Sequence, residues 1–256
     1  YDSPGQILEW DNSRGEFKHP IFWASIFTKA YKREFSVTDE ELAIVPVKNH
    51  KQAQSNPNAL SEKTYSLEDV INSKKLTDDL RLLDCSRPCT GGASILLASE
   101  DMCKKFTDIP IWITGIGQKT TSAGFTKNIA FSSMESTRIA ASTAFKMSKH
   151  NVKDIDVAEV HDAFSVCEPM ALESLGFADK GKGMNMIKEL HTTNNLKINP
   201  RGGLIGSGHP LGATGIAQTI EITQQLQSCA NKRQVENAKI GLVHNMSAAA
   251  TSSTVL

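Results

Sequence analysis

Residues 155–176 have the sequence IDVAEVHDAFSVCEPMALESLG. A short apolar run is followed by the polar pair His161 and Asp162 and then by a longer, largely apolar run. The first run, IDVAEV, predicts a buried strand that ends directly at His161. The second run, from Glu168, predicts a helix that Gly176 closes. A strand that passes directly into a helix predicts one unit of an α/β sheet.

The same alternation continues on both sides of this unit. Upstream, IPIWITGIGQ from Ile109 predicts a strand, and Ser132 with Glu135 predicts a capping box that starts a helix. Downstream, a glycine-rich loop precedes a predicted helix over residues 213–229, and AKIGLVHN predicts the last strand. This order of elements predicts an α/β sheet with helices packed on it.

The first part of the chain has a different pattern. Residues 1 to about 65 are mostly helical in pattern and carry an aromatic cluster that suits a pocket wall, a dimer contact or a core. The cluster consists of Phe17, Phe22, Trp23, Phe27, Tyr31 and Phe35. From Leu80, LRLLDCSRPCTGGASILLAS predicts a buried strand or strand pair. The composition changes near Asp108, so we expect two domains, over residues 1–108 and 109–256.

Composition excludes several classes of protein. The 28 basic residues balance the 28 acidic ones, which argues against nucleic acid as a partner. No apolar run is long enough to cross a bilayer, so we expect a soluble protein without a membrane partner. The five cysteines are odd in number and scattered, as is typical of a reducing compartment. Cys85 and Cys89 lack a second pair at zinc-finger spacing, so no metal site is expected.

The two ends of the sequence suggest that it belongs to a longer protein. It begins at Tyr1 without an initiator methionine, and it ends in AAATSSTVL, whose small and β-branched residues are typical of a strand. We therefore expect the natural termini and any targeting signals to lie outside this sequence.

Residues 199–215, NPRGGLIGSGHPLGATG, are crowded with glycine around a single histidine. Such a cluster indicates that the backbone turns sharply or is closely approached. His209 precedes Pro210 and a predicted helix N-terminus, an environment that keeps the imidazole neutral and suits a base or an oxyanion donor. A plain helix–strand connection is the alternative. The loop lacks the Gly-Lys-Ser/Thr of a phosphate-binding loop and comes too late in the chain for a dinucleotide fingerprint.

Three histidines, His161, His209 and His244, follow one another in this α/β unit. Each alone suits a buried, hydrogen-bonded role. With their neighbours they resemble the thiolase superfamily, in its sterol-carrier-protein-type and archaeal branch. GGLIGSGHPLGATG resembles the Gly-His-Pro motif, EVHDAFS the His-Asp-x-Phe motif and HNMS the terminal His-Asn motif. LLDCSRPCTGGASILLAS resembles the closing strands of the first thiolase domain, and the resemblance covers residues 41–255.

The resemblance implies a thiolase-like α/β fold of two similar α/β domains, each a mixed five-stranded sheet with helices on both faces, the first domain being incomplete. It implies an acyl-CoA C-acyltransferase that performs Claisen condensation, or thiolysis of a 3-ketoacyl-CoA, through a cysteine thioester. Coenzyme A thioesters are then the substrates, with no bound cofactor. The resemblance also implies a homodimer or larger homo-oligomer, a small acyl-CoA-binding partner subunit as a further candidate, and a cytoplasmic location, or a peroxisomal one in a eukaryote.

The resemblance assigns a role to each candidate site residue. His209 activates the nucleophile and helps to hold the first oxyanion hole, and His161 orients a water or donates to the same thioester oxygen. His244 lies by the second oxyanion site. The backbone of that oxyanion site comes from Asn245 and Ser247. The substrate-binding residues are Gly206, Gly208 and Phe164.

Three departures leave alternatives open. The family's nucleophilic cysteine is expected outside this chain, which alone is then inactive, and Cys89 and Cys167 are interpreted as small buried hydrophobes. Ala163 stands where this branch often has an acid/base cysteine, and SAAATSS from Ser247 replaces a glycine-rich turn. A thiolase-fold carbon–carbon lyase and a non-catalytic CoA-binding scaffold are therefore the alternatives.

Overall fold

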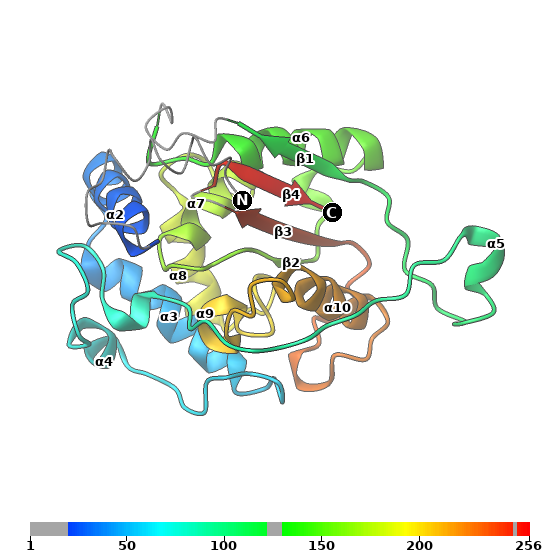
Figure 1. The fold of residues 1–256 in the computed structure, drawn as a ribbon, viewed down its shortest axis with the longest axis horizontal. Helices are drawn as coiled ribbons and strands as arrows, with labels where there is room; N and C mark the ends of the chain where they lie inside the picture. Colours follow the sequence, from blue (N-terminus) through cyan, green and yellow to red (C-terminus); the bar gives the residue numbers. More distant parts are fainter. Residues whose placement is uncertain (1–19, 122–129, 248–249) are drawn as a thin grey trace.

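The computed structural model describes residues 20–121, 130–247 and 250–256 (Figure 1). In chain order its helices and strands are α2 Ile21–Phe35, α3 Asp39–Ala53, α4 Leu67–Ile71, α5 Glu100–Cys103, β1 Gly117–Thr120, α6 Glu135–Ser148, β2 Val157–Glu159, α7 Cys167–Leu175, α8 Gly183–Thr193, α9 Gly203–Ser207, α10 Thr214–Leu226, β3 Gly241–Ser247 and β4 Ser252–Val255. Short 3₁₀ turns lie at Leu82–Asp84, Val152–Asp154 and Asn231–Arg233.

The strands of the described residues form one mixed sheet in the order β1-β4-β3-β2. Strand β3 is parallel to β2 and antiparallel to β4, which is in turn antiparallel to β1. Helix α6 packs on β1 and β4, whereas α10 packs on β2 and β3 (Figure 1). The predicted mixed sheet is confirmed, with four strands in this part of the chain in place of the expected five.

Strand β3 shows which helix covers which face of the sheet. Successive side chains of a strand point to opposite faces. His244 bonds to Thr137 of α6, while the next residue, Asn245, bonds to Gln218 of α10. The two helices therefore cover opposite faces, as predicted, and two neighbouring candidate residues point away from each other.

Most helix ends follow local signals, but one prediction is wrong. Helix α7 ends at Gly176, whose φ is +92°, and α10 begins close to its predicted start. Helix α6 begins at Glu135 with Met134 as N-cap and without a side-chain cap, so the predicted capping box is not formed. Ser132 instead donates its hydroxyl to the Glu34 carboxylate of α2. A tertiary partner outcompetes the local backbone for this hydroxyl.

Of two predicted strands, one is not formed in the described part of the chain and the other is formed only at its end. Residues 80–99 make a 3₁₀ turn, isolated bridges such as that between Pro88 and His209, and otherwise extended chain. Residues 109–116 have no regular secondary structure, and β1 begins only at Gly117. Extended chain becomes a strand when a neighbour supplies a hydrogen-bonded ladder, and no described strand lies in register with these segments.

Some elements differ from the expected pattern elsewhere. Helix α8 was not predicted from the pattern, and the short α9 interrupts the glycine-rich loop. The strand expected in AAATSSTVL is confirmed as β4, which pairs with β3. Ala248 and Ala249 of the altered terminal turn lie outside the described residues.

The aromatic cluster belongs to the core. Trp23, Phe27 and Tyr31 of α2 are buried. The ring centroid of Trp23 lies 5.4 Å from that of Phe27 and 5.0 Å from that of Phe164, both edge to face. Phe17 lies outside the described residues. Trp23, Phe27 and Tyr31 therefore belong to the core, which was one of three interpretations of the cluster besides a pocket wall and a dimer contact.

Candidate active site

Two of the three predicted histidines meet at one edge of the sheet. His161 follows β2 by two residues, and His209 lies between α9 and α10. Their ring centroids are 5.1 Å apart, and the ring planes are inclined at 87°. The carboxyl ends of strands in α/β sheets are the usual position of ligand sites. The imidazole pair is therefore the centre of the candidate active site.

Asp162 holds the glycine-rich loop in place beside His161. Its carboxylate accepts hydrogen bonds from the backbone N–H of Leu204 at 2.6 Å and of Ile205 at 3.3 Å. Gly203 has a φ of +58°, and a Cβ there would lie 2.2 Å from the Asp162 carboxylate. Burial, and then the neighbouring Glu168, raise the pKa of Asp162 well above its usual range. Sequence reasoning did not assign Asp162 a role, although it is the second residue of the quoted His-Asp-x-Phe motif.

The glycines predicted to bind substrate make close contacts within the chain. A Cβ on Gly206 would lie 2.5 Å from the backbone oxygen of Asn49 in α3. Gly208 has a φ of +92°, and a Cβ there would lie 2.9 Å from Cys89 Sγ. Both glycines are therefore required by internal packing, and their contact with substrate stays a prediction.

His209 is fixed at one ring nitrogen and half-buried. Its Nδ1 lies 2.8 Å from Thr214 Oγ1, and its backbone N–H donates to the carbonyl oxygen of Arg87 at 2.9 Å. Burial, and then the charge of Arg201, lower the pKa of His209 below its ordinary value. A neutral imidazole is what the sequence predicted here, and such a ring can accept a proton at neutral pH.

His161 is buried and is held by an amide. The Asn245 side-chain nitrogen lies 3.1 Å from His161 Nδ1. Burial, and then the neighbouring rings of His209 and His244, lower the pKa of His161 well below its usual range. The ring is therefore neutral, and it suits a donor toward a developing oxyanion.

The ring of His244 lies outside the ring contact between His161 and His209. It is fully buried on the α6 side of the sheet, where its Nε2 lies 3.0 Å from Thr137 Oγ1. Its Nδ1 accepts the backbone N–H of His161 at 3.4 Å. Burial lowers the pKa of His244 to about 3. Both ring nitrogens are thus used inside the core, which is the structural role that a lone histidine at this position suggested.

Asn245 and Ser247 are placed differently from each other. The Asn245 side chain bonds to His161 and to Gln218 at the candidate site. Ser247 is exposed at the end of β3, where it pairs with Ser252 of β4. A backbone oxyanion role for these two residues stays a prediction, whereas the side chain of Asn245 has a direct structural partner in the imidazole pair.

Phe164 and Ala163 lie behind the histidines. Phe164 is buried against Trp23, so it supports the site from the core. Ala163 is buried as well, and its carbonyl oxygen accepts the backbone N–H of Ser86 at 2.9 Å. Its methyl group cannot exchange a proton, so no acid or base stands at the position where the branch often has cysteine.

The cysteines separate into two groups. Burial raises the pKa of Cys85 and of Cys167 to about 12, so both are thiols rather than thiolates at neutral pH. Cys89 is half-buried, its sulfur contacts Gly208, and the preceding Pro88 forms a bridge with His209. The sequence suggested a buried hydrophobe at Cys89, and the structure places this thiol beside the Gly-His-Pro segment.

A buried polar network under the site was missed in the sequence. Lys48 Nζ lies 2.9 Å from the Glu168 carboxylate, both being almost fully buried. Asn49 donates to Glu168 and to Asp162, at 2.7 Å each. Residues of α3 thus support the motif from more than a hundred positions away in sequence, a distance over which no local pattern signals contact.

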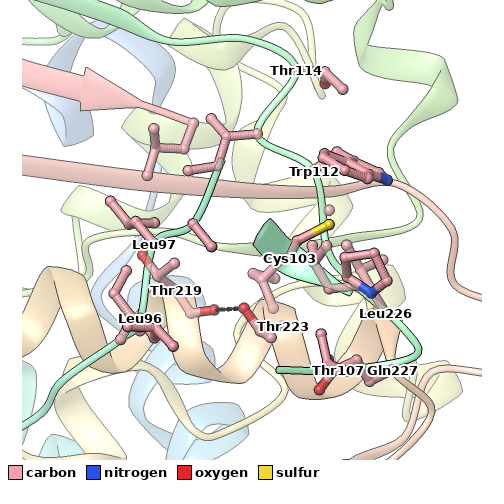
Figure 2. Close-up of a pocket in the computed structure, with 18 of the residues that line it drawn as sticks. Leu96, Leu97, Cys103, Thr107, Trp112, Thr114, Thr219, Thr223, Leu226 and Gln227 are labelled. Carbon is pink, nitrogen blue, oxygen red and sulfur yellow. Dashed lines mark hydrogen bonds between the residues drawn. The ribbon is translucent and has the colours of Figure 1, made fainter. Parts of the chain in front are cut away.

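A separate groove lies between the extended segments around α5 and one side of α10 (Figure 2). Its volume is about 550 Å³. Leu96, Leu97 and Trp112 face Thr219 and Leu226 across it. The two site histidines do not line it, so it is distinct from the candidate active site.

Metal-binding clusters and membrane-spanning helices are considered for the described residues alone. Within residues 20–121, 130–247 and 250–256, no group of three or more His, Cys, Asp or Glu side chains is arranged to hold a metal ion. Among the helices of the same residues, none has both the length and the apolar character needed to span a bilayer.

Known proteins resemble this chain in sequence. Residues 117–256 match the family described as thiolase C-terminal domain-like. The chain is 40% identical over 240 residues to the acetyl-CoA acetyltransferase of Methanothermobacter thermautotrophicus, covering 93% of this chain and 62% of the relative. It is 36% identical over 231 residues to sterol carrier protein 2 of Bos taurus, covering 85% and 41%. The chain therefore spans between 41% and 62% of the length of these relatives.

A solved structure named Ltp2-ChsH2(DUF35) aldolase has a similar fold. The TM-score is 0.84 over 100% of this chain and 67% of that one, at 20% sequence identity. At this identity the likeness concerns the fold alone, and it confirms the predicted thiolase-like α/β class. With the family match over residues 117–256, the chain belongs to the thiolase superfamily, and it resembles archaeal and sterol-carrier-protein members.

Proposed function

We propose that the complete protein is an acyl-CoA C-acyltransferase of the thiolase type. The observation that carries the proposal is the pair of neutral imidazoles, His161 and His209, whose ring centroids lie 5.1 Å apart at the carboxyl edge of the sheet. The likeness to relatives named acetyl-CoA acetyltransferase supports the same class. Because the chain spans only part of those relatives, the activity is proposed for the complete protein.

The first half-reaction uses the two rings in different ways. His209 takes the proton of the nucleophilic thiol while the sulfur attacks the thioester carbonyl carbon, and the carbonyl electrons move onto oxygen. His161 donates a hydrogen bond to that oxygen. The carbonyl then re-forms, the bond to the coenzyme A sulfur breaks, and the proton on His209 passes to that sulfur. The acyl group is left on the enzyme cysteine.

The second half-reaction joins or separates carbon atoms. In condensation, the α-carbon of a second acyl-CoA attacks the acyl-cysteine and releases the thiol, and thiolysis is the reverse. This step requires removal of a proton from the α-carbon. Ala163 cannot take it, so a different group has this task.

Ala163 also favours a second candidate, a carbon–carbon lyase of the thiolase fold. A retro-aldol cleavage needs a base toward a hydroxyl and a donor toward a carbonyl, which the two histidines can supply without a cysteine at position 163. A non-catalytic CoA-binding subunit is the third alternative, because it needs neither a nucleophile nor an acid.

Peptide-mapping mass spectrometry of the natural full-length protein after incubation with acetyl-CoA tests these alternatives. Acyl label on a cysteine outside this chain supports the acyltransferase and places its nucleophile there. Label on Cys89 supports the same chemistry with the nucleophile beside His209, and a Cys89→Ser variant should then lose the label. Binding of acyl-CoA without label at any cysteine would exclude the acyltransferase and favour the lyase or the scaffold.

The two-domain organisation is part of the proposal. Residues 1–108 are proposed to contain the remainder of a first domain and residues 109–256 to form the second. The segments on both sides of this boundary, around α5, expose large apolar side chains, namely Ile95, Leu96, Leu97, Ile109, Trp112, Ile113 and Ile116. Apolar extended segments of this kind need a covering sheet or chain.

The partners and the cellular location of the protein are also proposed from its likeness to thiolase relatives. An acyl-CoA thioester is the substrate, the protein is a homodimer or larger homo-oligomer, and it acts in the cytoplasm. The name of the similar aldolase joins Ltp2 with ChsH2(DUF35), which motivates a small partner subunit as a further candidate. Light scattering coupled to size-exclusion chromatography of the full-length protein measures its oligomeric state, and a monomeric mass would contradict the dimer.

A further inference from the structure

A chain of hydrogen bonds leads from a backbone carbonyl to His161, and its direction is fixed at the start. A carbonyl oxygen only accepts, so the side-chain nitrogen of Gln218 must face the His244 carbonyl, at 3.4 Å. The Gln218 oxygen then faces Asn245, whose Nδ2 donates to it at 2.9 Å. The orientation of one amide therefore dictates the orientation of the next.

The same nitrogen of Asn245 reaches His161. Asn245 Nδ2 lies 3.1 Å from His161 Nδ1, and an amide nitrogen has hydrogens but no lone pair to offer. His161 Nδ1 must therefore accept. In the neutral ring the hydrogen is then on Nε2, so His161 has a donor at the nitrogen that is left for a substrate.

His209 has the opposite arrangement. The Thr214 hydroxyl has one hydrogen, and it donates this hydrogen to the Pro210 carbonyl at 2.9 Å. Thr214 Oγ1 therefore accepts from His209 Nδ1 at 2.8 Å. The hydrogen of the neutral ring is on Nδ1, and Nε2 has a free lone pair.

We propose that Gln218, through Asn245, and Thr214 are positioning residues that hold His161 and His209 in opposite tautomers, one ring offering a donor and the other an acceptor. Both positioning residues belong to α10, so one helix sets both rings. The tautomers follow from the hydrogen-bond geometry alone. Their use, with His209 as the base and His161 as the oxyanion donor, rests on the proposed function.

The tautomers can be read directly. We would record two-bond ¹H–¹⁵N correlation spectra of the full-length protein with ¹⁵N-labelled histidine at about pH 8, above the ordinary histidine pKa of roughly 6.5. His161→Gln and His209→Gln variants assign the two rings. The expected result is hydrogen on Nε2 of His161 and on Nδ1 of His209. Hydrogen on Nδ1 of His161, or on Nε2 of His209, would overturn the proposal.

Substitutions test the relay separately from the fold. Asn245→Asp replaces the amide donor by a carboxylate that only accepts, so the hydrogen of His161 should move to Nδ1 while His209 is unchanged. Gln218→Met keeps the side-chain size but leaves Asn245 free to rotate, so His161 should show a mixture of its two neutral tautomers. The control is Gln225→Met, two turns further along α10, which should leave the tautomers of both rings unchanged. Thr214→Val should release His209, and Thr214→Ser should preserve its tautomer.

Activity provides a second, independent readout. Loss of an oxyanion donor costs roughly 100-fold or more in kcat, so Asn245→Asp should lower acyl transfer by about that factor with a smaller change in KM. Unchanged His161 tautomers in Gln218→Met and Asn245→Asp would exclude the relay. The predicted tautomers together with no acyl transfer in the original protein would keep the relay and exclude the acyltransferase function.

Discussion

At the scale of single residues, burial determines the charge of the site histidines. His161 is buried and His209 is half-buried, and loss of contact with water disfavours the charged form of an imidazole. A neutral pair can sit with ring centroids 5.1 Å apart without the repulsion that two imidazolium ions would suffer. Burial lowers the pKa of both rings, and the proximity of His209 lowers that of His161 further.

The lowered pKa of His209 predicts a shifted pH profile. A base acts in its unprotonated form, so the acid limb of acylation should lie below the ordinary histidine pKa of roughly 6.5. His209→Gln should slow acylation by about 100- to 10,000-fold and remove this limb. Rapid-quench mass spectrometry of the full-length protein across pH measures both. A limb at or above the ordinary value would contradict the neutral-base role.

His244 predicts an acid-sensitive stability. Its pKa is about 3 in the folded protein and roughly 6.5 when unfolded, so the unfolded state takes up this proton first. Its stabilising contribution is complete above about pH 6.5 and is lost as the pH falls towards 3.

Urea unfolding at several pH values tests that contribution. The difference in free energy of unfolding between the original protein and His244→Gln should shrink as the pH falls below about 6.5. His150 on the surface offers the control, because His150→Gln removes an exposed imidazole. A difference that does not vary with pH in His244→Gln would show that His244 does not titrate on unfolding.

At the scale of elements, the glycine-rich loop is ordered by other parts of the chain. Its crowding with glycine predicted a close approach, and the structure identifies the approaching groups as α3 and Asp162. The sequence could not name them, because α3 precedes the loop by about 150 residues. Local signals did predict β2, α7, α10 and β3, each of which has its own capping or hydrophobic pattern.

The close approach of Asp162 predicts an unequal response of two glycines. Gly203→Ala would place a methyl 2.2 Å from the Asp162 carboxylate at a positive φ, so it should destabilise the protein by more than about 1 kcal/mol. Gly212→Ala, in the same loop, meets nothing within 4 Å and should change stability by less than about 0.5 kcal/mol. Urea unfolding of the two variants compares them, and equal losses would contradict the role of Asp162.

At the scale of the whole molecule, the apolar side chains around α5 have no cover among the described residues. Leu96 and Leu97 are each 70% exposed, and Trp112 is 54% exposed. These side chains lie in the two segments that the sequence predicted as strands. Burial in a larger assembly would remove this surface from water and complete the missing ladders.

Leu97→Lys should therefore affect stability differently in the full-length protein and in residues 1–256 alone. In the full-length protein it should lower the free energy of unfolding by about 2–5 kcal/mol, as expected for a core position. In residues 1–256 alone it should leave stability nearly unchanged and reduce aggregation. Met147→Lys on exposed α6 provides a control with little effect in either protein. An unchanged stability of the full-length variant would show that Leu97 remains exposed there.

Sequence patterns alone predicted β2, α7, α10 and β3, the neutral state expected of His209 and the motifs that identify the superfamily. Which of the three histidines meet depends on contacts between segments that are distant in sequence. His244 and Asn245 are neighbours in the chain, but the pleat of β3 sends the first to α6 and the second to the site. Likewise Lys48 and Glu168 meet only after folding. Local patterns depend on near neighbours, whereas a site depends on contacts between distant segments, and those are set when the sheet and its helices pack together.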